Sequence, residues 1–394
     1  MSKKISLGII FGGRSVEHEV SILTGQQVIQ SADRDKYEIV PIYLDRDNLW
    51  YIGKDAGDIE FFRQKVIPLG KLNRVFPCPD PRRGKLSLIK VESGLFRKRK
   101  PITVDCVIPA CHGTFGEDGA LQGLLEMANV PYAGSNLSAS AVGMNKIIFK
   151  AVLKSTGLPC LPYLTAIGSE WQTDPEGMIS KIDREFSQAV FIKPAVLGSS
   201  VGISRADSSD RLRDALELAF QFGDRVLIEP AVDGGKEINC SVVDGDPPLP
   251  SILEQPVSSE ELLTFDEKYK GRAVKGSKGT KGSKAGKGMA AQQRLIPAPL
   301  EDSMTAEIQD LAVRTFQAVG AGGVARIDFL ISSDGEILIN ELNNIPGSLS
   351  FYLWERMGKS FSELIDRMVE RAYEVNKLQN RTTFSFEANL LAGE

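Results

Sequence analysis

Two acidic side chains in the last third of the chain are spaced to meet across a β-hairpin. Asp328 and Glu341 lie in strand-like runs on either side of Asp334-Gly335, a dipeptide typical of two-residue turns. With these two residues as the turn, Ser333 pairs with Glu336, and Asp328 then faces Glu341. Directly opposed residues have Cβ atoms roughly 4.5–5.5 Å apart. The spacing therefore predicts a pair of carboxylates on one face of the hairpin.

The same register places Arg326 opposite Asn343, so a guanidinium and an amide join the two carboxylates. Facing carboxylates repel each other unless a cation lies between them. Oxygen ligands of this kind suit Mg²⁺, which commonly takes one or two carboxylates together with substrate phosphates. A solvated hairpin face with scattered charges would pair in the same way. The Asn-Ile-Pro-Gly loop of residues 344–347, which follows directly, favours the magnesium site.

A second group of residues has the types that hold phosphate groups. Lys193 ends a strand-like run, and the Gly-Ser-Ser-Val-Gly turn of residues 198–202 follows it. Such a turn offers backbone N–H groups and hydroxyls to phosphate oxygens, and a nearby lysine adds a point charge. Lys146 and Lys150, one helical turn apart, are a second source of positive charge. The turn departs from GxxxxGK[ST], so it is no P-loop, and many ordinary hairpins contain a similar turn.

Glu229 ends another strand-like run, next to the boundary that we expect between two lobes. A carboxylate beside free backbone groups at that place suits a ribose hydroxyl or an adenine amino group. An ordinary charge at the end of a strand fits the sequence equally well.

These residues need a scaffold, and strand and helix signals alternate along the first third of the chain. Residues 5–13, 37–45 and 104–113 are predicted strands, and residues 19–32 and 120–128 are predicted helices. Strands that alternate with helices imply a parallel sheet with ligands at the carboxyl ends of its strands. Gly12-Gly13 and His112-Gly113 lie at such ends.

The rest of the chain predicts two further α/β lobes. We expect an N-terminal domain over residues 1–133, a central lobe over 134–229 and a C-terminal lobe over 230–394. Ser138 is expected to cap a helix that continues to Gly157.

Within the loop of residues 270–288, residues 275–288 are low in complexity, with lysine at every third position and glycine between most of the lysines. So few triplets without proline cannot form a collagen helix, so we expect a flexible loop. Its glycines make order unfavourable without a ligand, and its lysines attract anions. A lid over nucleotide phosphates and a solvated insertion both fit this pattern.

The composition argues against several classes of function. The 394 residues are 42% apolar and 25% charged, and the net charge of −4 gives no reason to expect nucleic acid as a partner. No stretch approaches the roughly 18 apolar residues of a membrane span, so no membrane partner is expected. Five cysteines without a CxxC pair, with only two histidines, argue against zinc and favour a reduced, cytoplasmic compartment.

The chain resembles a known family, the D-alanine–D-alanine ligases. The resemblance covers nearly the whole chain and rests on several motifs in the family's order, which are Gly12-Gly13-Arg14-Ser15-Val16-Glu17, His112-Gly113 with Gly116-Glu117-Asp118-Gly119, Lys193-Pro194 with Gly198-Ser199-Ser200-Val201-Gly202, Lys268-Tyr269, Arg326-Ile327-Asp328 and Glu341-Leu342-Asn343. The resemblance implies an α/β, three-lobed ATP-grasp fold with a parallel-sheet N-terminal domain and with ATP between the central and C-terminal lobes.

The resemblance also implies roles for single residues. It implies that two Mg²⁺ ions, or Mn²⁺ in their place, are carried by Asp328, Glu341 and Asn343. It implies that ATP is contacted by Lys146, Lys193, Ser199, Glu229, Glu237 and Lys268. Glu17 would hold the ammonium of the first amino acid, with His112 near its carboxylate, while Ser199 and Tyr269 would orient Glu17.

For the second substrate the resemblance points to Arg326 and the Gly347 backbone, which would stabilise a tetrahedral intermediate. Tyr352 and Leu353 would lie beside the acceptor. The family usually has a small hydroxyl residue at the position of Tyr352, where it binds the acceptor's carboxylate, so this chain departs from the pattern. Residues 351–354 either reshape the acceptor pocket or are core packing, with another residue serving the carboxylate.

The implied reaction is a ligation driven by ATP. ATP phosphorylates a carboxylate, an amine attacks the acyl phosphate, and phosphate leaves. One hypothesis is a ligase that joins two D-alanines for peptidoglycan precursors. A second is a related ligase with a different amine or hydroxyl acceptor, and a third is a nucleotide-binding regulator without catalysis, against which the metal residues argue. Amino acids are the expected partners, and a homodimer would suit the family.

Overall fold

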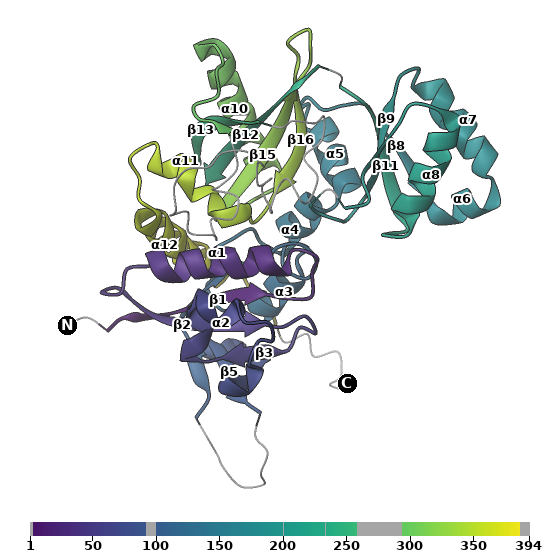
Figure 1. Cartoon of the computed structure of the whole chain (residues 1–394). Coiled ribbons are helices and arrows are strands. Elements are labelled where there is room, and N and C mark those ends of the chain that lie inside the picture. The colour runs from purple at the N-terminus through teal and green to yellow at the C-terminus, as the bar shows by residue number, and fades with distance from the viewer. Residues whose placement is uncertain (1–2, 92–99, 200, 233, 258–293, 387–394) are drawn as a thin grey trace, which may run out of the picture.

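The computed structural model describes residues 3–91, 100–199, 201–232, 234–257 and 294–386. Its strands form three sheets, which Figure 1 shows as three lobes. A seven-stranded sheet belongs to the N-terminal part of the chain, a four-stranded sheet to the middle and a five-stranded sheet to the last part. No helix in the described ranges is long and apolar enough to cross a membrane.

The seven-stranded sheet has the order β6-β5-β4-β3-β2-β1-β7. Its strands are β1 (Ile5–Gly12), β2 (Tyr37–Leu44), β3 (Trp50–Ile52), β4 (Asn73–Cys78), β5 (Leu86–Lys90), β6 (Ile102–Val104) and β7 (Cys106–Pro109). Only β2, β1 and β7 run parallel, and the others pair antiparallel. The predicted parallel sheet is thus confirmed for three strands. The antiparallel part was not predicted, because strands as short as β3 and β6 carry little periodic signal.

Three helices accompany this sheet, namely α1 (His18–Ser31), α2 (Ile59–Phe62) and α3 (Ala120–Met127). The predicted helix over 19–32 is confirmed as α1. Because β1 and β7 are parallel neighbours, Gly12-Gly13 and His112-Gly113 follow the carboxyl ends of adjacent strands, as predicted. The loops that carry Glu17 and His112 therefore meet at one edge of the sheet.

The predicted helix from Ser138 to Gly157 is wrong in two respects, and the first is that it is two helices. They are α4 (Leu137–Met144) and α5 (Lys146–Ser155). Asn136 caps α4 by accepting a hydrogen bond from the Ala139 N–H, so Ser138 is not the cap. Asn145 leaves the helical conformation, and its side chain caps α5.

The four-stranded sheet has the order β10-β9-β11-β8 and is antiparallel. It consists of β8 (Leu164–Ile167), β9 (Val190–Pro194), β10 (Ser204–Ala206) and β11 (Arg225–Pro230), with helices α6 (Gly168–Thr173), α7 (Pro175–Glu185) and α8 (Ser209–Phe220). Ile192 and Ile228 belong to the core beneath these helices. Side chains alternate along a strand, so Lys193 and Glu229 point to the opposite face.

The five-stranded sheet has the order β14-β13-β12-β15-β16 and is also antiparallel. It consists of β12 (Lys236–Val243), β13 (Leu249–Pro256), β14 (Arg294–Leu295), β15 (Val324–Ile331) and β16 (Ile337–Asn343), with α10 (Asp302–Ala318). Ile327 and Phe329 of β15 are core residues, together with Phe149 of α5 and Phe316 of α10. Alternation along the strand leaves Arg326 and Asp328 on the other face.

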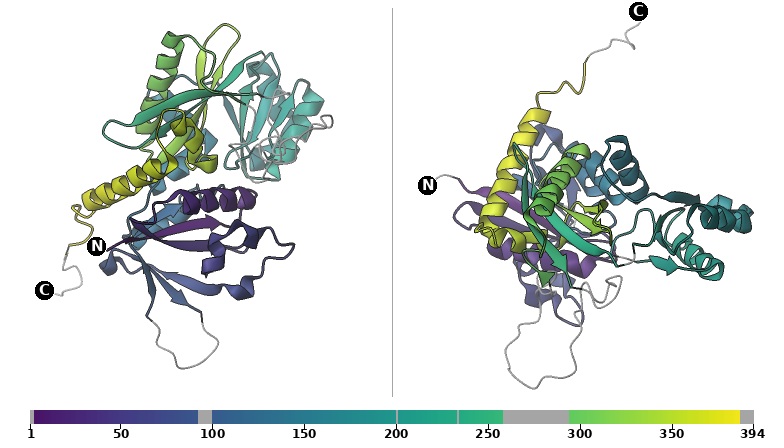
Figure 2. Two further views of the ribbon diagram at one scale, coloured as in Figure 1. Left: turned by 60° about the vertical axis from the view of Figure 1, so that its left-hand side comes forward. Right: turned by 90° about the horizontal axis from the view of Figure 1, so that it is seen from above.

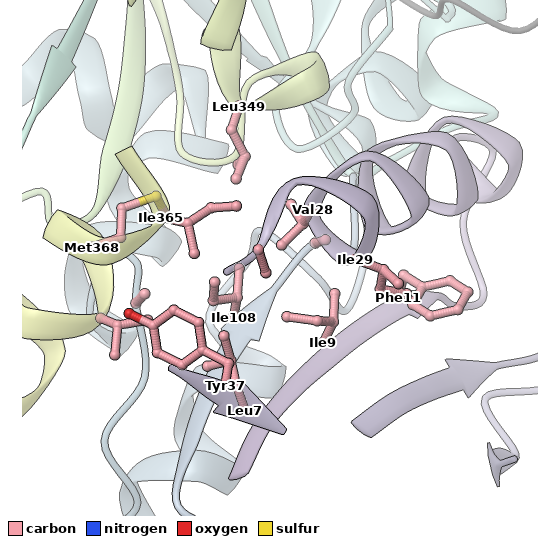
Figure 3. Close-up of a cluster of buried hydrophobic side chains, with 14 of the residues drawn as sticks. Leu7, Ile9, Phe11, Val28, Ile29, Tyr37, Ile108, Leu349, Ile365 and Met368 are labelled. Atoms are coloured by element: carbon pink, nitrogen blue, oxygen red, sulfur yellow. The ribbon is translucent and has the colours of Figure 1, made fainter. Parts of the chain in front are cut away.

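The end of the chain returns to the first sheet. After a 3-10 turn (Gly347–Ser350) come α11 (Phe351–Glu355) and α12 (Phe361–Gln379). Figure 2 shows α12 alongside α1 and the seven-stranded sheet. Ile365 and Met368 share one buried cluster with Leu7, Ile9 and Val28, which Figure 3 shows. The domain bounds at residues 133 and 229 stay a prediction.

Candidate active site

The hairpin of β15 and β16 carries the predicted pairs at the site. Arg326 pairs with Asn343, and Asp328 pairs with Glu341. The four side chains lie on the face that points away from the core residue Ile327. The predicted convergence of two carboxylates, an amide and a guanidinium is therefore confirmed.

The turn that joins the two strands is different from the prediction. Ser332 and Glu336 are partners, since the Ser332 N–H donates to the Glu336 carbonyl, so residues 333–335 form a three-residue loop. Gly335 has a φ of +88°, which this kind of loop requires. A β-bulge at Asn340 then shifts the register by one residue. The two offsets cancel, and for this reason the pairs at the site agree with the prediction although the turn does not.

The Asp328 carboxylate is held on both oxygens. Arg326 donates from Nε to Oδ1 at 2.6 Å and from Nη2 to Oδ2 at 2.7 Å, and Asn343 Nδ2 donates to Oδ2 at 2.9 Å. Burial disfavours the charge of Arg326, but the Asp328 carboxylate outweighs it and holds the pKa of the guanidinium well above its usual value. Arg326 is therefore a fixed positive charge beside the two carboxylates.

The donor set fits a magnesium ion. Among the residues described, no third aspartate, glutamate, histidine or cysteine joins Asp328 and Glu341 in a metal-binding group. Two carboxylates and the Asn343 amide leave coordination positions for phosphate oxygens and water, which is the usual arrangement for Mg²⁺ at a nucleotide.

Glu17 is a buried carboxylate between three glycine-rich loops. The Ser199 hydroxyl donates to its Oε1. A Cβ at Gly113 would lie 2.6 Å from its Oε2, and a Cβ at Gly198 would lie 3.0 Å from the same atom. Gly113 also has a φ of +73°. The sequence therefore keeps side chains away from Glu17 and brings Ser199 to it, as predicted.

Glu229 forms an ion pair with two lysines. Its Oε1 lies 2.6 Å from Lys150 Nζ, and its Oε2 lies 2.8 Å from Lys193 Nζ. Burial disfavours both charges, but the pairing outweighs it, so the pKa of Lys193 is raised and that of Glu229 is lowered. Lys150 is only 1% exposed. The prediction that Lys150 contacts phosphate is wrong, because its ammonium is enclosed against Glu229.

Lys146 lies beside the turn after β9. It is the first residue of α5, its backbone N–H donates to the Ala195 carbonyl at 2.8 Å, and its Nζ donates to the Leu197 carbonyl at 2.6 Å. Its charge is therefore held next to the Gly-Ser turn, where the prediction places phosphate.

A cavity of about 70 Å³ joins half of the predicted site residues. It is lined by the predicted Glu17, His112, Lys146, Ser199, Arg326, Glu341, Asn343 and Gly347. A larger cavity of about 470 Å³ lies among β8, α6 and α7, and none of the predicted residues lines it. The chemistry is therefore concentrated in the smaller cavity.

Glu117 was given no role from the sequence, although it belongs to one of the family motifs. Its Oε2 accepts from the Gly113 N–H at 2.7 Å and its Oε1 from the Ile345 N–H at 2.9 Å. Burial, followed by the nearby Glu17 carboxylate, raises the pKa of Glu117 to about 8. It connects the loop after β7 with the loop after β16.

Tyr352 and Leu353 do not line the smaller cavity. The Tyr352 hydroxyl donates to Glu254 Oε1 at 2.9 Å, and the Arg294 guanidinium lies 4.3 Å from the centre of its ring. Arg294 also pairs with Glu254 Oε2 at 2.6 Å. Leu353 is fully buried. Their predicted contact with an acceptor stays a prediction.

Four further predictions are not tested by the positions of the described residues. Lys268, Tyr269 and the loop over 270–288 lie outside the described residues. Glu237 pairs with Leu330 across β12 and β15, and its charge helps to raise the pKa of Lys193. Its predicted contact with ATP stays a prediction.

Comparisons with known proteins agree on one family. The profile described as "D-ala D-ala ligase N-terminus" matches residues 6–135, and that described as "D-ala D-ala ligase C-terminus" matches residues 152–370. A D-alanine–D-alanine ligase of Thermosipho africanus is 35% identical over 386 residues, with 98% of each chain covered. One from Heliobacterium modesticaldum is 36% identical, with 93% of this chain and 94% of the relative covered.

Solved structures give the same result. The D-alanine–D-alanine ligase of Coxiella burnetii is similar with a TM-score of 0.78 and 27% identity, over 96% of this chain and 97% of the other. The VanG D-Ala:D-Ser ligase of Enterococcus faecalis has a TM-score of 0.76 and 26% identity, over 94% of this chain and all of the other.

Proposed function

Since the chain belongs to the D-alanine–D-alanine ligase family, we propose that it joins two D-alanine molecules at the expense of ATP for peptidoglycan precursors. The observation that carries this proposal is the cavity shared by Glu17 and the hairpin residues Arg326 and Glu341. A carboxylate suited to a substrate ammonium and a guanidinium suited to a substrate oxyanion border the same space. Such a space can hold an amino acid while its carboxylate reacts.

The charge of each residue determines its role in the proposed reaction. Glu17, oriented by Ser199, binds the ammonium of the first D-alanine. Lys146 and Lys193 attract the anionic phosphates of ATP. Arg326 and the backbone N–H of Gly347 stabilise the oxyanion that develops when the acceptor amine attacks the acyl phosphate.

Magnesium would be held by Asp328, Glu341 and Asn343. When bound, it offsets the charge of the phosphate groups during transfer. The carboxylates supply the negative charge that holds the ion, and Arg326 keeps the Asp328 carboxylate in place.

A phosphate-release screen tests the proposed function. The full chain with ATP and Mg²⁺ is offered D- and L-amino acids, singly and in pairs, and products are identified by mass. We expect the fastest release with D-alanine alone and a product with the mass of the dipeptide. If D-alanine gives phosphate release only in the presence of a second, different amine, that result would contradict the proposal and support a related ligase.

The acceptor is the part of this proposal for which a second candidate has its own observation. The Tyr352 hydroxyl gives its proton to Glu254 and therefore cannot donate it to an acceptor's carboxylate. An acceptor other than D-alanine, such as a D-amino acid with a hydroxyl side chain, is the alternative. The similar VanG protein is described as a D-Ala:D-Ser ligase.

Competition between D-alanine and D-serine as acceptors distinguishes the two candidates. Tyr352→Ser should change the preferred acceptor, because removal of the ring opens space. Tyr352→Phe is the matched control, since it keeps the ring and removes only the hydroxyl. An acceptor ranking that is the same in wild type and both variants would remove Tyr352 from the acceptor site.

The proposal includes two broader properties. We propose a cytoplasmic location, because the reaction consumes ATP, and a homodimer, which would suit the family. Sedimentation velocity over a range of concentrations tests the homodimer.

A further inference from the structure

The loop after Gly347 has an unusual backbone. Ser348, Leu349 and Ser350 have φ angles of +57°, +49° and +50°, so three consecutive residues other than glycine are left-handed. This conformation is disfavoured for L-residues, because Cβ approaches the following carbonyl oxygen. It persists only where the surroundings determine it, and such residues concentrate at functional sites.

The surroundings of this turn are the N-terminal sheet and its helix α1. Leu349 is 2% exposed and belongs to the buried cluster that contains Val28 of α1 and Ile365 of α12. Figure 3 shows Leu349 pointing into that cluster. Its packing holds the side chain of the turn but does not fix the direction of the backbone N–H groups.

Thr24 of α1 holds the backbone itself. The Ser348 N–H donates to Thr24 Oγ1 at 3.1 Å. Thr24 is 1% exposed, and a Cβ at the neighbouring Gly25 would lie 2.6 Å from the Phe11 side chain. The glycine therefore lets α1 lie close against β1, and this close approach places Thr24 under the turn.

His112 completes the arrangement on the other side. Its Nε2 lies 2.8 Å from Thr24 Oγ1. Burial lowers the pKa of His112 to about 4, so the ring is neutral, although a hydrogen bond to the Ile345 backbone works against the shift. Because that bond favours the protonated ring, the Ile345 carbonyl is the acceptor. Nε2 then accepts the Thr24 proton, and Thr24 accepts the Ser348 N–H.

The residues on both sides of Pro346-Gly347 are therefore tied to the N-terminal part of the chain. Ile345 is held by His112 and by Glu117, and Ser348 is held by Thr24. Gly347 itself lines the smaller cavity, whereas Thr24 does not.

We propose that Thr24 is a positioning residue for the Gly347 backbone donor. By holding Ser348 in the left-handed turn, its hydroxyl keeps the preceding Gly347 N–H directed at the reacting centre. His112 supports Thr24 in this role through its Nε2. This inference rests on the proposed function for its chemistry.

The decisive variant is Thr24→Val, which keeps the shape of the side chain and removes the hydroxyl. Loss of one oxyanion donor lowers kcat by about 10²–10³-fold in other enzymes, so a donor that is only misdirected should lower it by roughly 10–100-fold. The KM for ATP should not change. Thr24→Ser restores the hydroxyl and should keep most of the kcat.

Thr315→Val is the matched control. Thr315 is also fully buried, and its hydroxyl donates to the Leu311 carbonyl within α10. If the loss of any buried hydroxyl lowered kcat, the two valine variants would have the same lowered kcat. We expect Thr315→Val to keep the wild-type kcat. If Thr24→Val does not fold, Thr24→Ala is used with the same expectations.

Hydrogen exchange gives a second measurement that does not depend on activity. The Ser348 amide should exchange faster in Thr24→Val than in wild type and Thr315→Val. An active wild type with unchanged kcat and exchange in Thr24→Val would overturn the inference. A wild type that forms no dipeptide would refute the proposed function instead, and the exchange rate would then decide whether Thr24 holds the turn.

Discussion

At the scale of single residues, the two hairpin carboxylates differ in their surroundings. Both Asp328 oxygens already accept hydrogen bonds from Arg326 and Asn343, whereas Glu341 lines the cavity. Glu341 is therefore the carboxylate that borders the space for a ligand. This difference gives the first prediction.

Glu341→Gln should lower kcat by at least about 100-fold, because it removes a negative charge at the site of phosphoryl transfer. The thermal midpoint should stay close to that of wild type, since the side chains have the same shape. Steady-state kinetics at saturating ATP and Mg²⁺ measures the effect. Glu336→Gln, an exposed carboxylate of the same hairpin, is the control. Near-native kcat in Glu341→Gln would contradict a metal site on this hairpin.

Glu17→Gln should raise the KM for the first amino acid by roughly 10-fold or more and leave the KM for ATP nearly unchanged. The reason is the loss of a buried charge that pairs with the substrate ammonium, while Lys146 and Lys193 remain to hold phosphates. Initial rates with each substrate varied in turn measure the two constants. Glu19→Gln is the control, since the Glu19 side chain lies two residues further along, in α1, and is 85% exposed. Equal changes in both constants would argue against the assignment.

His112 gives a prediction for the dependence of stability on pH. Its pKa is about 4 in the folded chain and about 6.5 when unfolded. Between these values the unfolded chain binds the proton and the folded chain does not, so stability falls as pH decreases, by up to about 1.4 kcal/mol per pH unit. The free energy of unfolding of wild type should therefore decrease between pH 6.5 and 4 relative to that of His112→Gln. Parallel curves for the two proteins would show that the ring is not buried in its neutral form.

The residues that the sequence identified correctly are those whose chemistry shows in their own segment. Asp328 and Glu341 lie 13 positions apart in one hairpin, so they are neighbours in the fold, and the offsets of the turn and the bulge cancel between them. Glu117 and Ile345 are 228 positions apart, and Lys150 and Glu229 lie in different elements. No local periodicity reports such contacts, and for this reason Lys150 was misassigned and Thr24 was missed.

At the scale of elements, the hairpin shows why a correct pairing does not prove a correct turn. Asp334-Gly335 fits a two-residue turn, but Gly335 is equally suited to the last place of a three-residue loop. The sequence does not indicate the bulge at Asn340, because asparagine is also common in loops and at strand ends. The side chain of Asn340 accepts from Lys193 Nζ at 3.3 Å, so the bulge also connects the two sheets.

Deleting one residue at a time separates the roles of turn and bulge. Deletion of Asn340 should lower the rate of dipeptide formation, because it removes the bulge and the side-chain contact with Lys193, although Asp328 still faces Glu341. Deletion of Ser333 shortens only the exposed loop to Asp334-Gly335, so we expect it to retain activity. Product formation and circular dichroism are measured for both. Equal activity of the two deletion variants would show that neither the bulge nor the contact between Asn340 and Lys193 contributes to catalysis.

At the scale of the whole molecule, the last helix joins parts of the chain that are far apart in the sequence. Lys36 and Tyr37 near β2 both bond to Asp366 of α12. Ile365 is fully buried among residues of β1 and α1. The sequence of α12 does not say which sheet the helix covers. The seven-stranded sheet and the end of the chain should therefore unfold together.

Ile365→Ala tests this coupling, and the three tryptophans of the chain provide the probes. Trp50 lies in β3, Trp171 in α6 and Trp354 in α11. Variants that keep only one tryptophan are unfolded with urea and followed by fluorescence. Truncation of a buried isoleucine should destabilise its surroundings by about 2–5 kcal/mol. We expect the midpoints reported by Trp50 and Trp354 to fall together, and that of Trp171 to fall less. Leu378→Ala, at a 54% exposed position of the same helix, should change none of them. A lower midpoint for Trp354 alone would show that α12 and the N-terminal sheet unfold independently.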